Sequence, residues 1–161
     1  MRKRWVIGLL LLVGAVASAQ EPLTLEQVLA ANSAPTVKAT WHQVRHTELL
    51  TENLESDGVL YLEQPDKLRW ETLSPVHQLS VFSGESPKGR FRMPTEKDFR
   101  VSLLEGEEYT FILTPLRRDL KQLFSSVTLK VQRGSLQIQS ALLSSVDGDW
   151  TFIEFRDIVK E

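Results

Sequence analysis

The sequence contains no cysteine, and this absence removes several kinds of protein from consideration. Without cysteine there is no disulfide framework, no thiolate ligand for a metal and no cysteine nucleophile. A bacterial lipoprotein carries its lipid on a cysteine at the start of the mature chain, so this chain cannot be lipidated in that way. The fold must therefore be stabilised by burial of apolar side chains and by hydrogen bonds.

The chain also lacks the short motifs of common enzymes: it has no Gly-x-Ser-x-Gly, no glycine loop for phosphate and no HExxH. His42 and His46 lie four residues apart in a segment that reads as a strand, which would separate them by about 13 Å. That distance is too long for one metal ion. The sequence Asp147-Gly148-Asp149 lacks the acidic spacing of a calcium loop and is typical of a hairpin turn. We predict no enzyme activity, no metal and no cofactor.

Neither sign of charge dominates, since 19 Lys and Arg residues are interspersed with 21 Asp and Glu residues. Nucleic-acid binding normally requires a basic face that replaces the counterions of phosphate. We therefore predict that nucleic acid is not a partner. The length of 161 residues fits a single domain with a real core, and we expect a monomer.

Long apolar runs are absent except at the N-terminus. Residues 2–4 are basic, residues 5–16 are almost all apolar, and residues 17–19 read Ala-Ser-Ala. This order is typical of a secretory signal peptide, and the apolar stretch is shorter than the roughly 20 residues that span a bilayer. We predict cleavage after Ala19 and a mature domain of residues 20–161. Cleavage removes three positive charges and changes the formal net charge from -2 to -5.

Apolar and polar side chains alternate in about eight short stretches, which predicts β-strands that are buried on one face. The first stretch places Val37, Ala39 and Trp41 on one face. The others lie around residues 60–62, 68–70, 79–81, 109–113, 127–131, 136–138 and 152–158. Turn-forming residues separate them, for example Ser56-Asp57-Gly58 and Arg133-Gly134-Ser135. The chain is therefore predicted to be mainly β, with an antiparallel sheet.

Only two segments have helical spacing. Leu25, Val28 and Leu29 are spaced as one face of a short helix, and Thr24 with Gln27 forms a plausible capping box in front of it. Residues 115–124 predict a helical crossover, and residues 83–98 predict a loop that is rich in Pro, Gly and charge. A single sheet with one apolar face must curl or be covered. The sequence pattern leaves open whether the resulting hollow binds a ligand or is filled by the protein's own side chains.

Residues 39–45, 56–60 and 64–70, in the first half of the predicted sheet, form a collinear set of short motifs that resembles the first strands of the LolA family of lipoprotein carriers. Residues 39–45 read Ala-Thr-Trp-His-Gln-Val-Arg, like that family's aromatic-x-Gln-x-Arg strand. Residues 56–60 and 64–70 resemble its Ser-x-Gly-x-Leu and Pro-x-x-Leu-x-Trp motifs, in the same order and spacing. Residues 111–115 and 127–131 resemble its later strands. The chain is identified as a shortened, divergent member, similar in detail over residues 37–75.

This resemblance implies a fold and a function. The fold would be a curved antiparallel sheet that forms an incomplete barrel lidded by short helices. The function would be that of a soluble periplasmic carrier, which takes the acyl chains of a lipoprotein from an inner-membrane transporter and delivers them to an outer-membrane receptor. The expected wall of the acyl cavity consists of Trp41, Leu60, Leu62, Leu68, Trp70, Leu79, Val81, Phe111 and Leu113. The expected lid consists of Leu25, Val28, Leu29 and Gln64, whose apolar members fill the empty cavity until an acyl chain displaces them.

Two departures from the family pattern leave the cargo open. Gln64 stands where the enterobacterial carrier has an arginine that holds the lid, so any latch here is uncharged and weaker. Residues 83–100 are shorter than the corresponding lid region of that carrier. The alternatives are therefore a carrier of another acylated lipid or polyketide-type acyl product, and an envelope binding module that takes no lipid.

Overall fold

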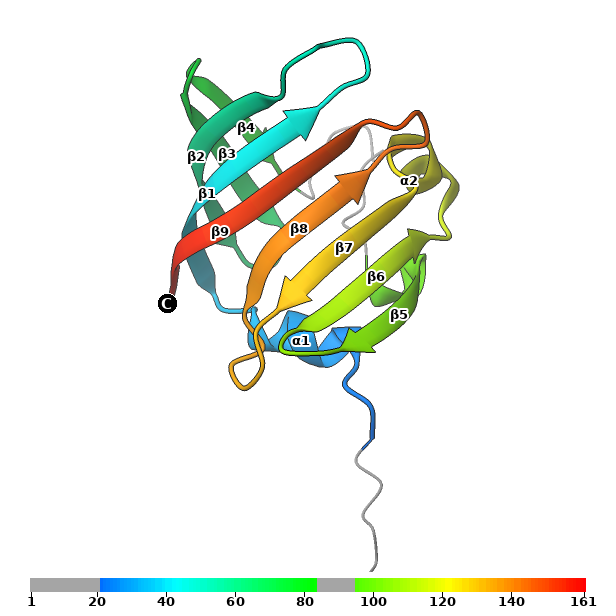
Figure 1. Cartoon of the computed structure of the whole chain (residues 1–161). Coiled ribbons are helices and arrows are strands. Elements are labelled where there is room, and N and C mark those ends of the chain that lie inside the picture. Colours follow the sequence, from blue (N-terminus) through cyan, green and yellow to red (C-terminus); the bar gives the residue numbers. More distant parts are fainter. Residues whose placement is uncertain (1–20, 84–94) are drawn as a thin grey trace, which may run out of the picture.

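The computed structural model describes residues 21–83 and 95–161, which form one nine-stranded antiparallel sheet with two short helices (Figure 1). The predicted signal peptide lies outside the described residues, as does most of the predicted loop at 83–98. Within the described part of the chain, no helix is both long and apolar enough to cross a bilayer.

The chain begins its described part with helix α1 (Leu25–Ala31) and then forms four consecutive strands. These are β1 (Thr36–His46), β2 (Leu54–Glu63), β3 (Lys67–Ser74) and β4 (Gln78–Phe82). A short 3-10 turn (Glu96–Asp98) leads into the second group, which consists of β5 (Phe99–Glu105), β6 (Tyr109–Pro115), α2 (Arg118–Leu123), β7 (Ser126–Val131), β8 (Ile138–Ser144) and β9 (Trp150–Lys160).

The strand order is β4-β3-β2-β1-β9-β8-β7-β6-β5, so two antiparallel meanders meet where β1 pairs with β9. The first and last strands of the chain thus lie at the centre of the sheet. Toward its two ends the sheet curls away from the viewer of Figure 1. Strands β4 and β5 remain the two edges and do not pair with each other, so the sheet is an incomplete barrel, as predicted.

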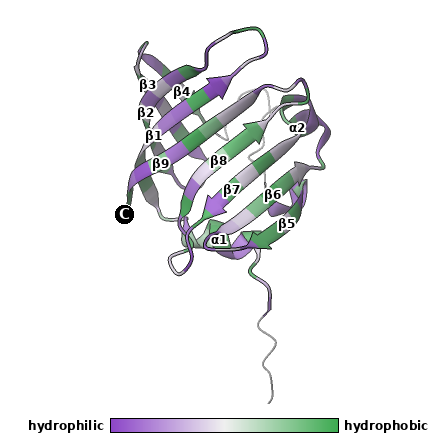
Figure 2. Ribbon diagram, in the orientation of Figure 1, coloured by the Kyte–Doolittle hydropathy of each residue, from purple (hydrophilic) through white to green (hydrophobic). Residues whose placement is uncertain are grey.

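The two faces of the sheet are defined by where α1 packs. Leu25 and Val28 of α1 form a buried cluster with Phe111, Leu113 and Val131. We call the face on which α1 lies the concave face and the opposite one the convex face. Hydropathy alternates along most strands, as Figure 2 shows, because successive side chains point to opposite faces.

Three local predictions can be compared with the structure. The capping box is confirmed: the Gln27 amide donates to Thr24 Oγ1 over 3.2 Å, and the Thr24 amide donates to Gln27 Oε1 over 3.0 Å. The predicted crossover contains α2, of which only Leu120 is buried. The predicted turn at residues 56–58 is wrong, because these residues continue β2.

The glycine at position 58 is explained by packing within β2 and not by a turn. It pairs with Trp41 across β1 and β2, and a Cβ at this position would collide with the Trp41 ring and with the Glu71 carbonyl. The glycine therefore makes room for the Trp41 indole on the concave face.

Strand β5 was not predicted from the sequence. Its Phe99, Val101 and Leu103 pair with β6 residues of the concave face, and Phe99 and Leu103 pack against the buried cluster. The alternation was present in the sequence, but the preceding charged and proline-containing segment obscured where the strand begins.

Candidate functional site

The concave face has a covered half and an open half. The covered half consists of β5 to β8 and lies under α1. Phe111 and Leu113, which were expected in the cavity wall, are 0% and 5% exposed beneath the helix. In this structure they therefore belong to the hydrophobic core and offer no free surface.

The predicted lid residues divide in the same way. Leu25 and Val28 are buried against Phe111 and Leu113, which is the contact expected between lid and wall. Leu29 is 39% exposed and is not part of this cluster. A helix of seven residues exposes its outer side, and Leu29 lies there.

The C-terminal end of α1 is held to the sheet by Asn32, which sequence reasoning missed. Asn32 Nδ2 donates to the carbonyls of Val28 and Leu136 over 2.8 and 2.7 Å. Asn32 Oδ1 accepts from Gln137 Nε2 over 2.6 Å and from the Ile138 amide over 3.0 Å. The partners on β8 and its preceding turn are more than 100 residues away in sequence, so no local pattern could have identified this anchor.

Three further hydrogen bonds join the C-terminal end of α1 and the connection after it to other parts of the chain. Lys160 Nζ donates to the Ala31 carbonyl over 2.6 Å, at the C-terminus of α1 where a positive charge is favourable. Gln64 Nε2 donates to Ser33 Oγ over 3.0 Å, and the Gln64 amide donates to the Pro35 carbonyl over 2.9 Å. Gln64 thus contacts the connection that follows α1 rather than the helix itself.

The open half consists of β1 to β4 with β9. Strand register places Leu60 opposite Ala39 and Trp70, and Leu62 opposite Val37 and Leu68. Directly paired residues point to the same face of a sheet. Five of the expected wall residues therefore share the concave face: Trp41, Leu60, Leu62, Leu68 and Trp70.

Leu79 and Val81 do not belong to this wall. They pair with Glu71 and Arg69, which point to the convex face, and they are 46% and 66% exposed. Ser80 pairs with Trp70 instead. The expectation for Leu79 and Val81 is wrong. Alternation shows which residues of one strand share a face, but the connection between β3 and β4 determines which face of the sheet that is.

A pocket of about 180 Å³ lies between the open half and the end of α1. Its lining is apolar apart from two amide side chains and consists of Asn32, Val37, Ala39, Leu60, Leu62, Gln137, Ile138, Phe155 and Ile158. A second concave pocket of about 350 Å³ lies at the other end of α1, where Leu23 and Leu25 face Val101 and Leu103 of β5.

Trp41 and Trp70 stack beside the first pocket, with ring centroids 4.6 Å apart and planes 20° from parallel. Trp41 is 3% exposed, and its Nε1 is a buried donor without an acceptor. A buried donor without a partner costs about 1–3 kcal/mol. Among the described residues of the concave face, Trp41 Nε1 is therefore an unused hydrogen-bond donor in an otherwise apolar surrounding.

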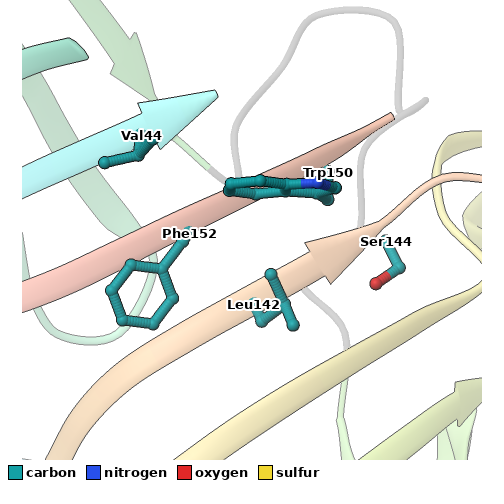
Figure 3. Close-up of a pocket in the computed structure, with 5 residues that line it drawn as sticks. All are labelled: Val44, Leu142, Ser144, Trp150 and Phe152. Carbon is teal, nitrogen blue, oxygen red and sulfur yellow. The ribbon is translucent and has the colours of Figure 1, made fainter. Parts of the chain in front are cut away.

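The convex face has a larger pocket, of about 480 Å³ (Figure 3). It is lined by Val44, Leu142, Ser144, Trp150 and Phe152. Sequence reasoning missed this site, although the runs Ala-Leu-Leu in β8 and Trp-Thr-Phe-Ile in β9 are apolar or large on both faces. Such runs indicate strands that offer apolar surface on two sides.

In the described part of the chain, the groups with a shifted pKa lie away from the concave wall. A hydrogen bond from His77 lowers the pKa of Glu71, whose side chain is on the convex face. Near α2, Arg117 lowers the pKa of Asp119 through a hydrogen bond of 2.6 Å. Among residues 21–83 and 95–161, no group of three or more His, Cys, Asp or Glu side chains could hold a metal ion.

The fold and this face define an open antiparallel half-barrel with an apolar concave surface. Residues 32–87 match the family described as outer membrane lipoprotein carrier protein LolA. The chain is therefore similar to this family from Asn32, which follows α1, through strands β1 to β4, which form most of the open half of the concave face.

A known protein is similar to part of the chain. An outer-membrane lipoprotein carrier protein from Methylococcus capsulatus is 37% identical over 82 residues, which is 50% of this chain and 39% of that protein. The match thus spans well under half the length of this relative.

Solved structures are similar at lower identity. A LolA superfamily protein from Nitrosomonas europaea is 11% identical with a TM-score of 0.47, covering 87% of this chain and 94% of that one. The MucA/MucB complex of Pseudomonas aeruginosa contains a chain that is 14% identical with a TM-score of 0.46, covering 84% of this chain and 55% of that one.

Proposed function

We propose that the protein is a periplasmic carrier that binds acyl chains on the open half of its concave face. The observation that carries this proposal is the apolar wall on β1, β2, β3 and β9 beside the pocket at the C-terminal end of α1, where Leu60, Leu62, Leu68, Trp70 and Phe155 are only half-buried. An acyl chain gains roughly 25 cal/mol for each Å² of apolar surface removed from water, and this wall supplies such surface.

The pocket is the starting point of the acyl site rather than its full extent. Its volume of about 180 Å³ is below the roughly 300–1,000 Å³ of typical ligand sites. The acyl chain would enter between Leu60, Leu62 and Phe155 and would continue along the concave face over Leu68 and Trp70.

Helix α1 acts as a fixed side wall in this proposal, and the open half is loaded first. Removing α1 from the sheet would expose Leu25 and Val28 and would break the three hydrogen bonds that join Asn32 to residues 136–138. Displacement of the helix, which we expected from sequence, would therefore be a costly second step that only a long or branched cargo could drive.

The unused donor of Trp41 suits a cargo that carries a carbonyl. Ester and amide groups join acyl chains to their lipid or protein, and a carbonyl oxygen could accept from Nε1 in a setting from which water is excluded. A pure hydrocarbon could not use this donor.

The cargo and the route follow from the family likeness. The matching family and its relative from Methylococcus capsulatus are described as outer-membrane lipoprotein carriers. We therefore propose lipoprotein acyl chains as cargo, an inner-membrane transporter as donor and an outer-membrane receptor as acceptor, with export by the signal peptide at residues 1–19.

The test uses two matched substitutions on neighbouring strands. Leu62→Asn puts a polar amide on the concave wall, and Leu79→Asn makes the same change on the convex face. Binding of a fluorescent acyl probe should weaken at least tenfold in Leu62→Asn and stay within twofold in Leu79→Asn. Equal affinity of the two variants would overturn the site.

Native mass spectrometry of protein purified from a periplasm identifies the cargo. A bound lipoprotein supports the proposal in full, and a different acylated lipid would change the cargo but keep the site. No bound lipid together with no probe binding would instead favour an envelope module without lipid.

A further inference from the structure

The convex face carries an apolar surface that the acyl site does not use. Figure 3 shows it on three adjacent strands, β1, β9 and β8. Register arranges it in two rows across the strands: Val44, Phe152 and Leu142 form one row, and His46, Trp150 and Ser144 form the next. The rings of His46 and Trp150 stack with centroids 5.4 Å apart. We call Val44, Leu142, Ser144, Trp150 and Phe152 the convex patch.

This patch departs from the pattern of the rest of the face. A sheet with one covered face normally presents polar residues on the other, and β7 does so with Ser126, Thr128 and Lys130. None of the apolar patch residues belongs to the buried core cluster, and each is half-buried. Apolar side chains gathered in this way on an outer surface mark interaction sites.

The border of the patch is acidic. Two segments adjoin or contain patch residues, at 47–57 and 143–155. Together they contain no Lys or Arg and seven acidic residues: Glu48, Glu52, Glu55, Asp57, Asp147, Asp149 and Glu154. Glu55 pairs directly with Val44 and therefore points to the same face.

Few positive groups offset this border. Arg156 donates to Glu154 over 2.9 Å, and His42 Nδ1 lies 2.7 Å from Asp57. In the described part of the chain, no ion pair joins Glu48, Glu55 or Asp147 to a basic side chain. The border thus surrounds the apolar convex patch with negative charge.

From this combination we infer that the convex patch docks an amphipathic segment of a partner protein, whose apolar side chains enter the pocket and whose Lys or Arg residues face the acidic border. The pocket volume of about 480 Å³ suffices for large apolar side chains. An anionic lipid surface would be repelled by the border, and in a symmetric dimer the two acidic borders would face each other. The sheet separates this site from the acyl site, so the inference stands whether or not the protein carries lipid.

The test compares three synthetic 14-residue helical peptides with the full-length secreted protein. The first has a Leu face and a Lys face, the second replaces Lys by Glu, and the third replaces Leu by Ser. Titration into ¹⁵N-labelled protein should shift the Trp150 indole signal with the first peptide. The other two should bind at least tenfold more weakly.

Variants distinguish the patch from general attraction between opposite charges. Phe152→Thr and Trp150→Thr should weaken the first peptide at least tenfold, whereas Leu79→Asn on the same face should leave it unchanged. The border variants Glu48→Gln and Glu55→Gln leave the convex patch unchanged. Each should weaken binding of the first peptide about threefold at low salt. These two border variants keep the test valid if Phe152→Thr or Trp150→Thr fails to fold.

Three outcomes would overturn the inference. The peptide could bind Phe152→Thr as well as the original protein, which would indicate non-specific attraction. The Trp150 signal could respond to vesicles of anionic phospholipid and not to the peptide. Light scattering could reveal a dimer that Phe152→Thr dissociates, which would assign the patch to a second copy of the chain.

Discussion

The covered and open halves of the concave face have the same alternation in sequence but different surroundings. Phe111 in the covered half has no exposed surface, because α1 lies over it. Phe155 in the open half lines a pocket and is only half-buried. The comparison teaches that alternation identifies the inward residues, while the packing of distant segments, the seven-residue helix α1 among them, decides which of them form core and which remain available to a ligand.

The largest expected effect compares equal truncations in the two halves. Phe111→Ala should lower the free energy of unfolding by about 3–5 kcal/mol, because it leaves a cavity in a fully buried cluster. Phe155→Ala should cost about 1 kcal/mol, because its ring is already partly in contact with water. Denaturant unfolding followed by circular dichroism measures both values. Similar losses in the two variants would show that the open half is covered in solution.

The next prediction removes the anchor that keeps the covered half covered. Asn32→Ala deletes four hydrogen bonds and leaves the Ile138 amide and the Leu136 carbonyl without this partner, so we expect a loss of about 2–3 kcal/mol. Amide hydrogen exchange should accelerate in α1 before it does so in β1. As a control, Gln27→Ala disturbs only the capping box at the other end and should cost about 1 kcal/mol. Unchanged exchange in α1 would mean that Leu25 and Val28 hold the helix without Asn32.

A third prediction concerns the open half alone. Gly58→Ala places a Cβ against the Trp41 ring and the Glu71 carbonyl, so one of them must move, at a cost of about 1–3 kcal/mol. The stacking of Trp41 on Trp70 should weaken, and near-ultraviolet circular dichroism should report this change. Gly106→Ala is the control, since it meets no atom closer than 3.7 Å. A stable variant with an unchanged near-ultraviolet spectrum would contradict the close approach.

The smallest effect on stability is expected for Trp41→Phe. This change removes the unsatisfied Nε1 donor and keeps an aromatic ring over Trp70, so stability should change by less than about 1 kcal/mol. Affinity for an acyl ester probe should fall severalfold, and affinity for a hydrocarbon of equal length should not. If both ligands lose the same affinity, the indole contributes apolar surface and no hydrogen bond.

The sequence was most informative where structure is local. The Thr24 and Gln27 cap, the short helix after it and the strand around Trp41 follow from side-chain chemistry over a few residues, and all of them are found in the structure. Leu79 and Val81 were assigned to the wrong face because a turn between two strands can shift the pairing by one residue. The convex patch was missed because its rows combine β1 with β8 and β9, about 100 residues away.

The sequence by itself determined the absence of cysteine chemistry, the mainly β composition and the inward residues of most strands. Only the tertiary structure decided that β1 lies beside β9, that α1 covers Phe111 and leaves Leu60 accessible, and that an apolar patch lies on the outer face. The physical reason is range: alternation and capping depend on neighbours along the chain, whereas coverage depends on contacts such as that of Asn32 with Leu136, which form only when distant segments pack together.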